Sequence, residues 1–162
     1  MSATKVQPIP EGFHALTPHL VCKDAVRAIE FYKQAFGAEE QFRLTGPDGA
    51  LIHASLRVGD SMLLLTDECP PMGAFGPQKL GGSPVTIHLS VADADASVAR
   101  AVAAGAKSTM PVTEMFWGAR YGVLQDPFGH SWSVATQVKN LSPEEIRAGL
   151  QAAMRDPVAK AG

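Results

Sequence analysis

Two histidines occupy matching positions in two similar stretches of the sequence. Residues 17–20 read Thr-Pro-His-Leu and residues 86–89 read Thr-Ile-His-Leu, and an aspartate follows each stretch at the same spacing. An imidazole can serve as a general acid or base, a metal ligand or a hydrogen-bond partner. If the two stretches fold alike, His19 and His88 occupy equivalent points, and they are our candidate catalytic residues.

The segment after each aspartate has the pattern of a helix with one buried stripe. Apolar or small residues recur at steps of four, three and four in both copies, which is the spacing of one helix face. Asp24 and Asp93 precede these segments as N-caps, and Gly37 and Gly105 follow them as C-caps. The stripe residues are Ala25, Ile29, Tyr32 and Phe36 in the first copy, and Ala94, Val98, Ala101 and Gly105 in the second.

Three strands are expected after each helix. The turn Gly46-Pro47-Asp48-Gly49 separates two strand-like runs, and Gly59 and Gly129 begin the matching final strands. The sequence therefore predicts an α+β fold of two βαβββ modules, 13–68 and 83–138, which together form a cupped mixed sheet. Residues 1–12 are expected to be a flexible N-terminus and 69–82 a linker loop. Ser142, Pro143 and Glu145 predict a capped C-terminal helix over 142–155.

Alternation along the first strand of each module assigns its two faces. Leu16, Leu20 and Cys22, and likewise Val85, Ile87, Leu89 and Val91, are predicted to face the helices. The opposite, concave faces should then carry the polar side chains and enclose one pocket between the modules. We expect the ligand-binding residues there to be Thr17, His19, His53, Ser55, Thr86, His88 and Ser133.

An aromatic cluster in the second module adds a candidate pocket wall. Phe116, Trp117 and Tyr121 lie close together in the sequence, beside Glu114 and Arg120. Aromatic side chains with a few polar groups are typical of ligand sites, but they also describe a packed hairpin. We include all three aromatics among the expected ligand-binding residues. Trp132 falls on the helix-facing side by alternation and is predicted to be core.

Composition excludes several classes of partner. A net charge of -2 with 19% charged residues gives no basic surface for nucleic acid or anionic lipid. Neither a signal peptide nor a membrane span is recognisable, so we expect a cytoplasmic protein. Cys22 and Cys69 have no spacing that indicates a metal site or a disulfide.

The combined motifs resemble PhnB-like members of the glyoxalase, bleomycin-resistance and dioxygenase (vicinal oxygen chelate) superfamily. The resemblance covers about residues 13–139 and rests on the paired modules, the stretch 29–38 and the run 115–118 leading to 126–130. It implies the two-module fold, and it implies a homodimer. In the superfamily's metal-dependent members the first and last strands of each module supply the metal ligands, and those positions here hold Thr17, Leu63, Thr86 and Ser133.

Two functions remain open at this point. Three hydroxyls and a leucine cannot replace imidazole or carboxylate ligands, which favours a protein that binds a small, partly aromatic molecule without a metal or other cofactor. The alternative is a glyoxalase-like lyase, isomerase or dioxygenase acting on a small oxygenated metabolite. Such an enzyme would use His19 and His88 as acid and base. Alternatively, His19 and His88 would bind a displaced divalent metal, with Glu114 or His53 as the third ligand.

Overall fold

The computed structural model describes residues 6–156, and the chain divides into two compact units between Gly81 and Gly82. The first unit contains β1 (His19–Cys22), α1 (Ala25–Phe36), β2 (Glu39–Thr45), β3 (Leu51–Val58) and β4 (Ser61–Asp67). The second contains β5 (Thr86–Ser90), α3 (Ala94–Ala103), β6 (Lys107–Glu114), β7 (Ala119–Gln125) and β8 (Ser131–Gln137). The helix α4 (Pro143–Arg155) follows β8.

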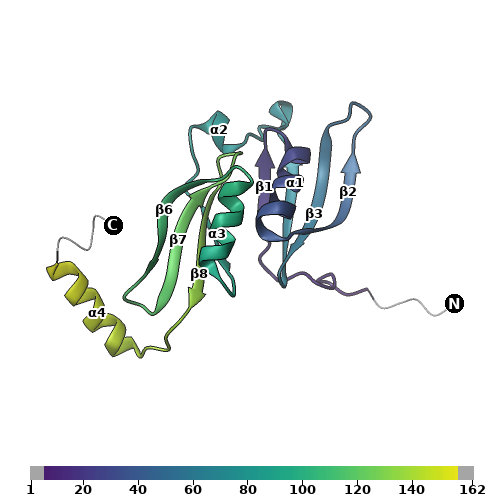
Figure 1. Cartoon of the computed structure of the whole chain (residues 1–162). Helices are drawn as coiled ribbons and strands as arrows, with labels where there is room; N and C mark the ends of the chain where they lie inside the picture. The colour runs from purple at the N-terminus through teal and green to yellow at the C-terminus, as the bar shows by residue number, and fades with distance from the viewer. Residues whose placement is uncertain (1–5, 157–162) are drawn as a thin grey trace. The chain divides into compact units, whose positions relative to one another are not determined.

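Both units have the predicted βαβββ order, so the α+β fold class is confirmed. The strand orders are β1-β4-β3-β2 and β5-β8-β7-β6, with the first strand parallel to the last and the other pairs antiparallel. Figure 1 shows α1 and α3 each lying across one face of its own sheet. This leaves the opposite face of each sheet uncovered by the unit's own helix, and the ligand-site residues were predicted on that face.

The N-termini of α1 and α3 are capped as predicted, and each also forms an equivalent hydrogen bond to a residue far away in the sequence. Asp24 and Asp93 accept the backbone N–H groups of Arg27 and Ala96. The first residue of each helix in addition donates its N–H to the end of the last strand. Ala25 donates to Asp67 and Ala94 donates to Thr136. These matched bonds fix each helix against its sheet and extend the internal repeat.

The helix C-termini differ between the copies. Gly37 adopts the predicted left-handed conformation, with φ 66°. In the second unit, α3 ends at Ala103, and its C-cap is Ala104, which has a right-handed backbone conformation. Gly105 is therefore not the C-cap. Gly105 comes next with φ 118°, so the sharp change of direction is still made at glycine.

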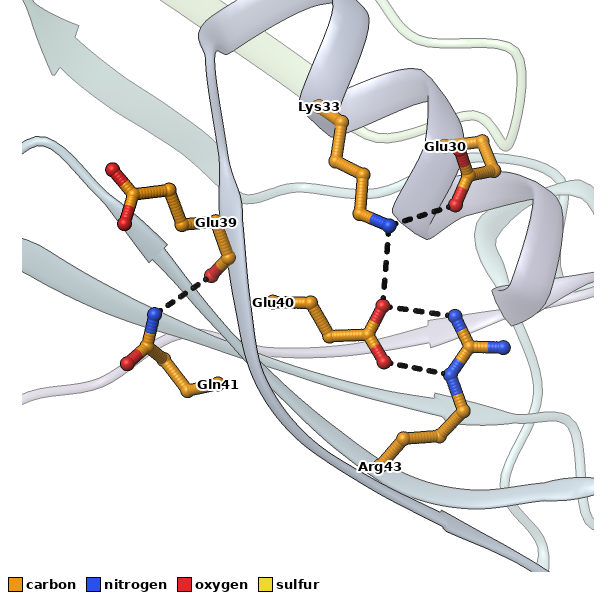
Figure 2. Close-up of polar contacts among 6 residues, drawn as sticks. All are labelled: Glu30, Lys33, Glu39, Glu40, Gln41 and Arg43. Atoms are coloured by element: carbon orange, nitrogen blue, oxygen red, sulfur yellow. Dashed lines mark hydrogen bonds and ion pairs between the residues drawn. The ribbon is translucent and has the colours of Figure 1, made fainter.

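Ion pairs join α1 to β2 on the helix-facing side of the first sheet. Figure 2 shows Lys33 between Glu30 and Glu40, and two nitrogens of the Arg43 guanidinium bound to the two carboxylate oxygens of Glu40. Arg43 holds the pKa of Glu40 below its usual range, assisted by Lys33. Because these groups are partly exposed, we assign them a role in orienting the edge strand rather than a large stabilising effect.

The core lies between each helix and its sheet. Leu20 and Cys22 are buried as predicted, and Trp132 is 2% exposed with its indole N–H donated to Asp126. Leu16 and Val85 do not reach the core, because both precede their strands and are 91% and 62% exposed.

The chain between the sheets is more ordered than a plain loop. It contains a short 3-10 turn η1 (Pro70–Met72) and a single helical turn α2 (Pro77–Leu80). The C-terminal helix is confirmed, including the reciprocal capping bonds of Ser142 and Glu145. Among residues 6–156, no helix is both long and apolar enough to cross a membrane.

Candidate functional site

The uncovered face of the second sheet carries three predicted site residues on two neighbouring strands. The parallel register pairs Thr86 with Ser131 and His88 with Ser133. The His88 Nδ1 atom lies 2.7 Å from the Ser133 hydroxyl, and Thr86 and Ser131 share a longer hydroxyl contact. Ser133 is 2% exposed, so the serine is a buried anchor that fixes the imidazole of His88.

A row of aromatic rings continues from His88 across the same face. Tyr121 pairs with Ala135 across the sheet, and its ring is nearly parallel to that of His88, with centroids 6.2 Å apart. Trp117 contacts Tyr121 edge to face at 5.5 Å, and Phe116 contacts Trp117 in the same way at 4.9 Å. The predicted aromatic cluster and the second histidine thus belong to one arrangement.

The turn between β6 and β7 positions the two outer rings. Gly118 donates its N–H to the Met115 carbonyl at 3.0 Å and has φ 88°, which favours glycine. The Gly118 carbonyl in turn accepts the N–H groups of Val138 and Lys139 after β8. These bonds clamp the turn that carries Phe116 and Trp117 to the end of the sheet.

A groove of about 710 Å³ opens beside His88 and Trp117. Its other apolar walls are Val91, Ala92, Ala119 and Ala135, and its other polar walls are Ser90, Thr136 and Gln137. The volume is that of an ordinary small-molecule site. Every lining residue belongs to the second unit.

The charged residues beside the aromatic cluster face away from the groove. Arg120 pairs with Asp95 of α3, which places it on the helix-facing side of the sheet. Glu114 is opposite Arg120 in the register and forms an ion pair with Lys139. Glu114 and His88 therefore lie on opposite faces of the sheet, so the alternative metal set that includes both is not assembled.

The first unit gathers a second group of predicted site residues. The register places His19, His53 and Ser55 on one face, together with Phe42 of the edge strand. The His19 and His53 rings meet edge to face with centroids 6.1 Å apart, and Phe42 lies 6.3 Å from His53. Burial lowers the pKa of His19 below its ordinary value, and the neighbouring His53 lowers the pKa further.

The strand register corrects one of the four positions that were matched to the metal ligands of the superfamily. Leu63 is opposite Leu56 and buried on the helix-facing side, whereas Leu64 is the residue opposite His19. The position on the uncovered face is therefore Leu64, and Thr17 lies just before β1. That a single pocket unites His19 with His88 stays a prediction.

The donors do not fit a divalent metal ion. The family's ligand positions carry hydroxyls and a leucine, with Leu64 in place of Leu63, and these are poor ligands for such ions. Within the described residues of either unit, no three His, Cys, Asp or Glu side chains are grouped to hold a metal.

Several groove and face residues were not predicted. Ala92, Ala119, Ala135 and Gln137 line the groove, and Phe42 extends the first unit's aromatic group. Strand alternation places Ser90 on the same face as His88, although Ser90 was not counted among the ligand-binding residues. Alternation could likewise have identified Phe42, since it shares a face with His53. The alanines carry no chemical signal of their own, so only the assembled groove identifies them.

A family model and a similar protein both cover most of this chain. The model of the Glyoxalase/Bleomycin resistance protein/Dioxygenase superfamily matches residues 12–134. Protein Mb0911c of Mycobacterium bovis is 48% identical over 139 residues, covering 84% of this chain and 91% of that protein.

Solved structures show the same fold. The Arabidopsis thaliana gene product At5g48480 is 33% identical with a TM-score of 0.62, covering 76% of this chain and 98% of that one. The fosfomycin resistance protein FosX of Listeria monocytogenes, solved with Mn(II), is 15% identical with a TM-score of 0.59, covering 80% of this chain and 91% of that one. The second likeness shows the fold alone. By the family match and the 48% identity, the chain belongs to the glyoxalase, bleomycin-resistance and dioxygenase superfamily.

Proposed function

We propose that this protein binds a small, partly aromatic molecule in the groove of its second unit, without a metal ion or other cofactor. The observation that carries the proposal is the joint lining of one 710 Å³ groove by the His88 imidazole and the Trp117 indole. An aromatic wall provides a stacking surface, and a fixed imidazole provides a directional hydrogen bond.

The anchoring of His88 supports a binding role. Ser133 occupies Nδ1, so Nε2 is the ring nitrogen that a ligand can use. Because the ring is already fixed, less side-chain conformational entropy is lost when a ligand binds. The hydroxyls and leucine at the family's metal positions support the metal-free form of the proposal, because they cannot supply the ligand set of a divalent ion.

A ligand screen by thermal shift, with two histidine variants, tests the proposal. A compound present at a hundred times its dissociation constant should stabilise the wild type by about 2.7 kcal/mol. His88→Ala should abolish that stabilisation, measured against the unfolding temperature of the same variant without ligand. His14→Ala removes an exposed histidine outside both groups and serves as the control. Equal stabilisation of both variants would refute a groove at His88.

A histidine-based enzyme is the second candidate. The observation in its favour is again His88, because a ring held at Nδ1 can present Nε2 to a substrate as acid or base. This form would turn over a small oxygenated metabolite as a lyase, isomerase or dioxygenase. Elemental analysis of protein purified without chelator separates it from a metal-dependent enzyme. Stoichiometric metal lost in His88→Ala would overturn the metal-free proposal.

Two narrower assignments also stand as proposals. The PhnB-like subgroup is supported by the motifs quoted above from the stretch 29–38 and the run 115–130. A cytoplasmic location is supported by Cys22 and Cys69, neither of which forms a disulfide.

A further inference from the structure

We propose that the groove of the second unit selects uncharged, flat aromatic molecules that carry one hydrogen-bonding group, and that it rejects their carboxylated counterparts. This inference rests on the proposed function and defines its ligand class. It follows from three features of the groove: the absence of charge, the small residues in its walls and the position of its remaining polar atoms.

Among the described residues, the lining of the groove contains no formally charged side chain. Its polar members are His88, Ser90, Thr136 and Gln137, and no Lys, Arg, Asp or Glu of residues 6–156 lines it. The nearby cations are already paired, since Arg120 binds Asp95 on the other face and Lys139 binds Glu114. A carboxylate entering the groove would lose water without gaining a cationic partner, and that loss is costly.

Small residues shape the space beside Trp117. Ala92, Ala119 and Ala135 all line the groove, and Ala119 and Ala135 are buried in the wall. Alanine side chains in the lining leave the space near the indole without long projecting side chains. Such a space favours a flat ring system, because a ring can contact the indole and the alanine methyl groups together.

The polar atoms still available are few and close to the strand ends. Thr136 is used internally, since its hydroxyl donates to Val91 and accepts from Ala94. Gln137 donates its side-chain N–H to the Lys139 carbonyl, which leaves its amide oxygen for a ligand. With His88 Nε2 and the Ser90 hydroxyl, these atoms suit one or two hydroxyl, carbonyl or amide groups.

Titration calorimetry with 2-naphthol and 2-naphthoate at about pH 8 tests the inference, because the two probes share a ring system and differ in charge. We expect 2-naphthol to bind wild-type protein at least about tenfold more tightly than 2-naphthoate. Ala92→Phe should remove binding of both probes by filling the groove from an exposed position. Ala99→Phe, on the exposed face of α3, makes the same change outside the groove and should have no effect.

A charge introduced into the groove provides the complementary test. Ala92→Lys should improve 2-naphthoate binding by several fold relative to the wild type, because it supplies the missing cation. If wild-type protein binds 2-naphthoate as tightly as 2-naphthol, and Ala92→Phe abolishes both, the selectivity is wrong but the groove function stands. If neither probe binds, the ligand class is wrong. The groove function is then tested with a compound found by thermal shift: it stands if Ala92→Phe abolishes binding of that compound. Binding unaffected by Ala92→Phe would overturn both.

Discussion

Asp126 shows how one buried carboxylate shapes the strand behind the groove. It accepts the backbone N–H groups of Phe128 and His130 and the indole N–H of Trp132, all at 2.9–3.0 Å. The residue is 4% exposed, so these three donors have no ready access to water. The arrangement closes the turn before β8 and sets the start of the strand that carries Ser133.

Removing this carboxylate should therefore destabilise the protein strongly. Each buried donor left without a partner costs about 1–3 kcal/mol, so we expect Asp126→Ala to lower the free energy of unfolding by at least about 3 kcal/mol in urea denaturation. Asp60→Ala changes the exposed aspartate in the corresponding hairpin of the first unit and should cost less than about 1 kcal/mol. Comparable losses for the two variants would contradict the structural role of Asp126.

His19 gives the stability of the protein a pH dependence of known sign. Its pKa is lowered in the folded state, first by burial and then by the neighbouring His53. The unfolded chain therefore binds a proton at His19 more readily than the folded chain does. As a result, the free energy of unfolding decreases as the pH falls from about 7 through the lowered pKa. His19→Gln should reduce the drop in melting temperature between about pH 7.5 and pH 5.5.

The matched control for this titration is His14→Gln, which removes an exposed histidine from the segment before β1. It should melt with the same pH dependence as the wild type. A drop in melting temperature that is equally large in His19→Gln and in the wild type would show that the imidazole of His19 does not contribute.

At the scale of elements, helix starts were predictable because their signals are local. Asp24, Asp93 and the Ser142 capping box each act within one helical turn, and all three form as expected. Strand register was less predictable. Aligning the copies on Gly59 and Gly129 matches Leu63 with Ser133. In the sheets, however, the residue opposite His19 is Leu64 and the residue opposite His88 is Ser133, so the true match differs by one residue. This shift put Leu63 in place of Leu64.

The groove was the least predictable feature because it depends on contacts between elements. The sequence indicated His88 and Trp117 as separate candidates, and only the folded β6–β7 turn brings them to one cavity. Ala119 and Ala135 contribute by being small, which leaves no motif to recognise. The internal repeat identified the face, and tertiary packing determined the cavity on it.

The packing of α4 on the β6–β7 turn leads to a prediction at the same scale. A Cβ atom added at Gly149 would lie 3.1 Å from the Phe116 carbonyl oxygen and 3.2 Å from the Phe116 Cβ. Phe116 in turn packs against Trp117. Gly149→Leu should therefore displace α4 and weaken binding of a groove ligand by several fold, although residue 149 does not line the groove. Calorimetry with any confirmed ligand measures the change.

The neighbouring substitution Ala148→Leu is the control for this prediction. Ala148 is exposed on the same helix, so the change adds similar bulk without approaching Phe116. Its ligand affinity should match that of the wild type. Equal affinities for Gly149→Leu and the wild type would show that the helix does not support the groove wall.

At the scale of the whole molecule, α4 leaves apolar surface without cover. The described helix has no buried residue, and Leu150 and Met154 on its apolar stripe are 43% and 66% exposed. A helix of this length is marginal unless an apolar face is packed. The edge strands β2 and β6 also leave unpaired backbone groups, which proteins commonly protect by association.

We propose that two copies of the chain form a symmetric homodimer in which α4 covers its apolar stripe against the partner. Light scattering during size exclusion at micromolar concentration should give twice the chain mass. The double variant Leu150→Glu, Met154→Glu should shift the protein to a monomer, because it places charges within the apolar stripe. Ala148→Glu with Gln151→Glu adds the same charges to the polar side of α4 and should remain dimeric. A wild-type monomer, or dissociation by both double variants alike, would exclude this interface.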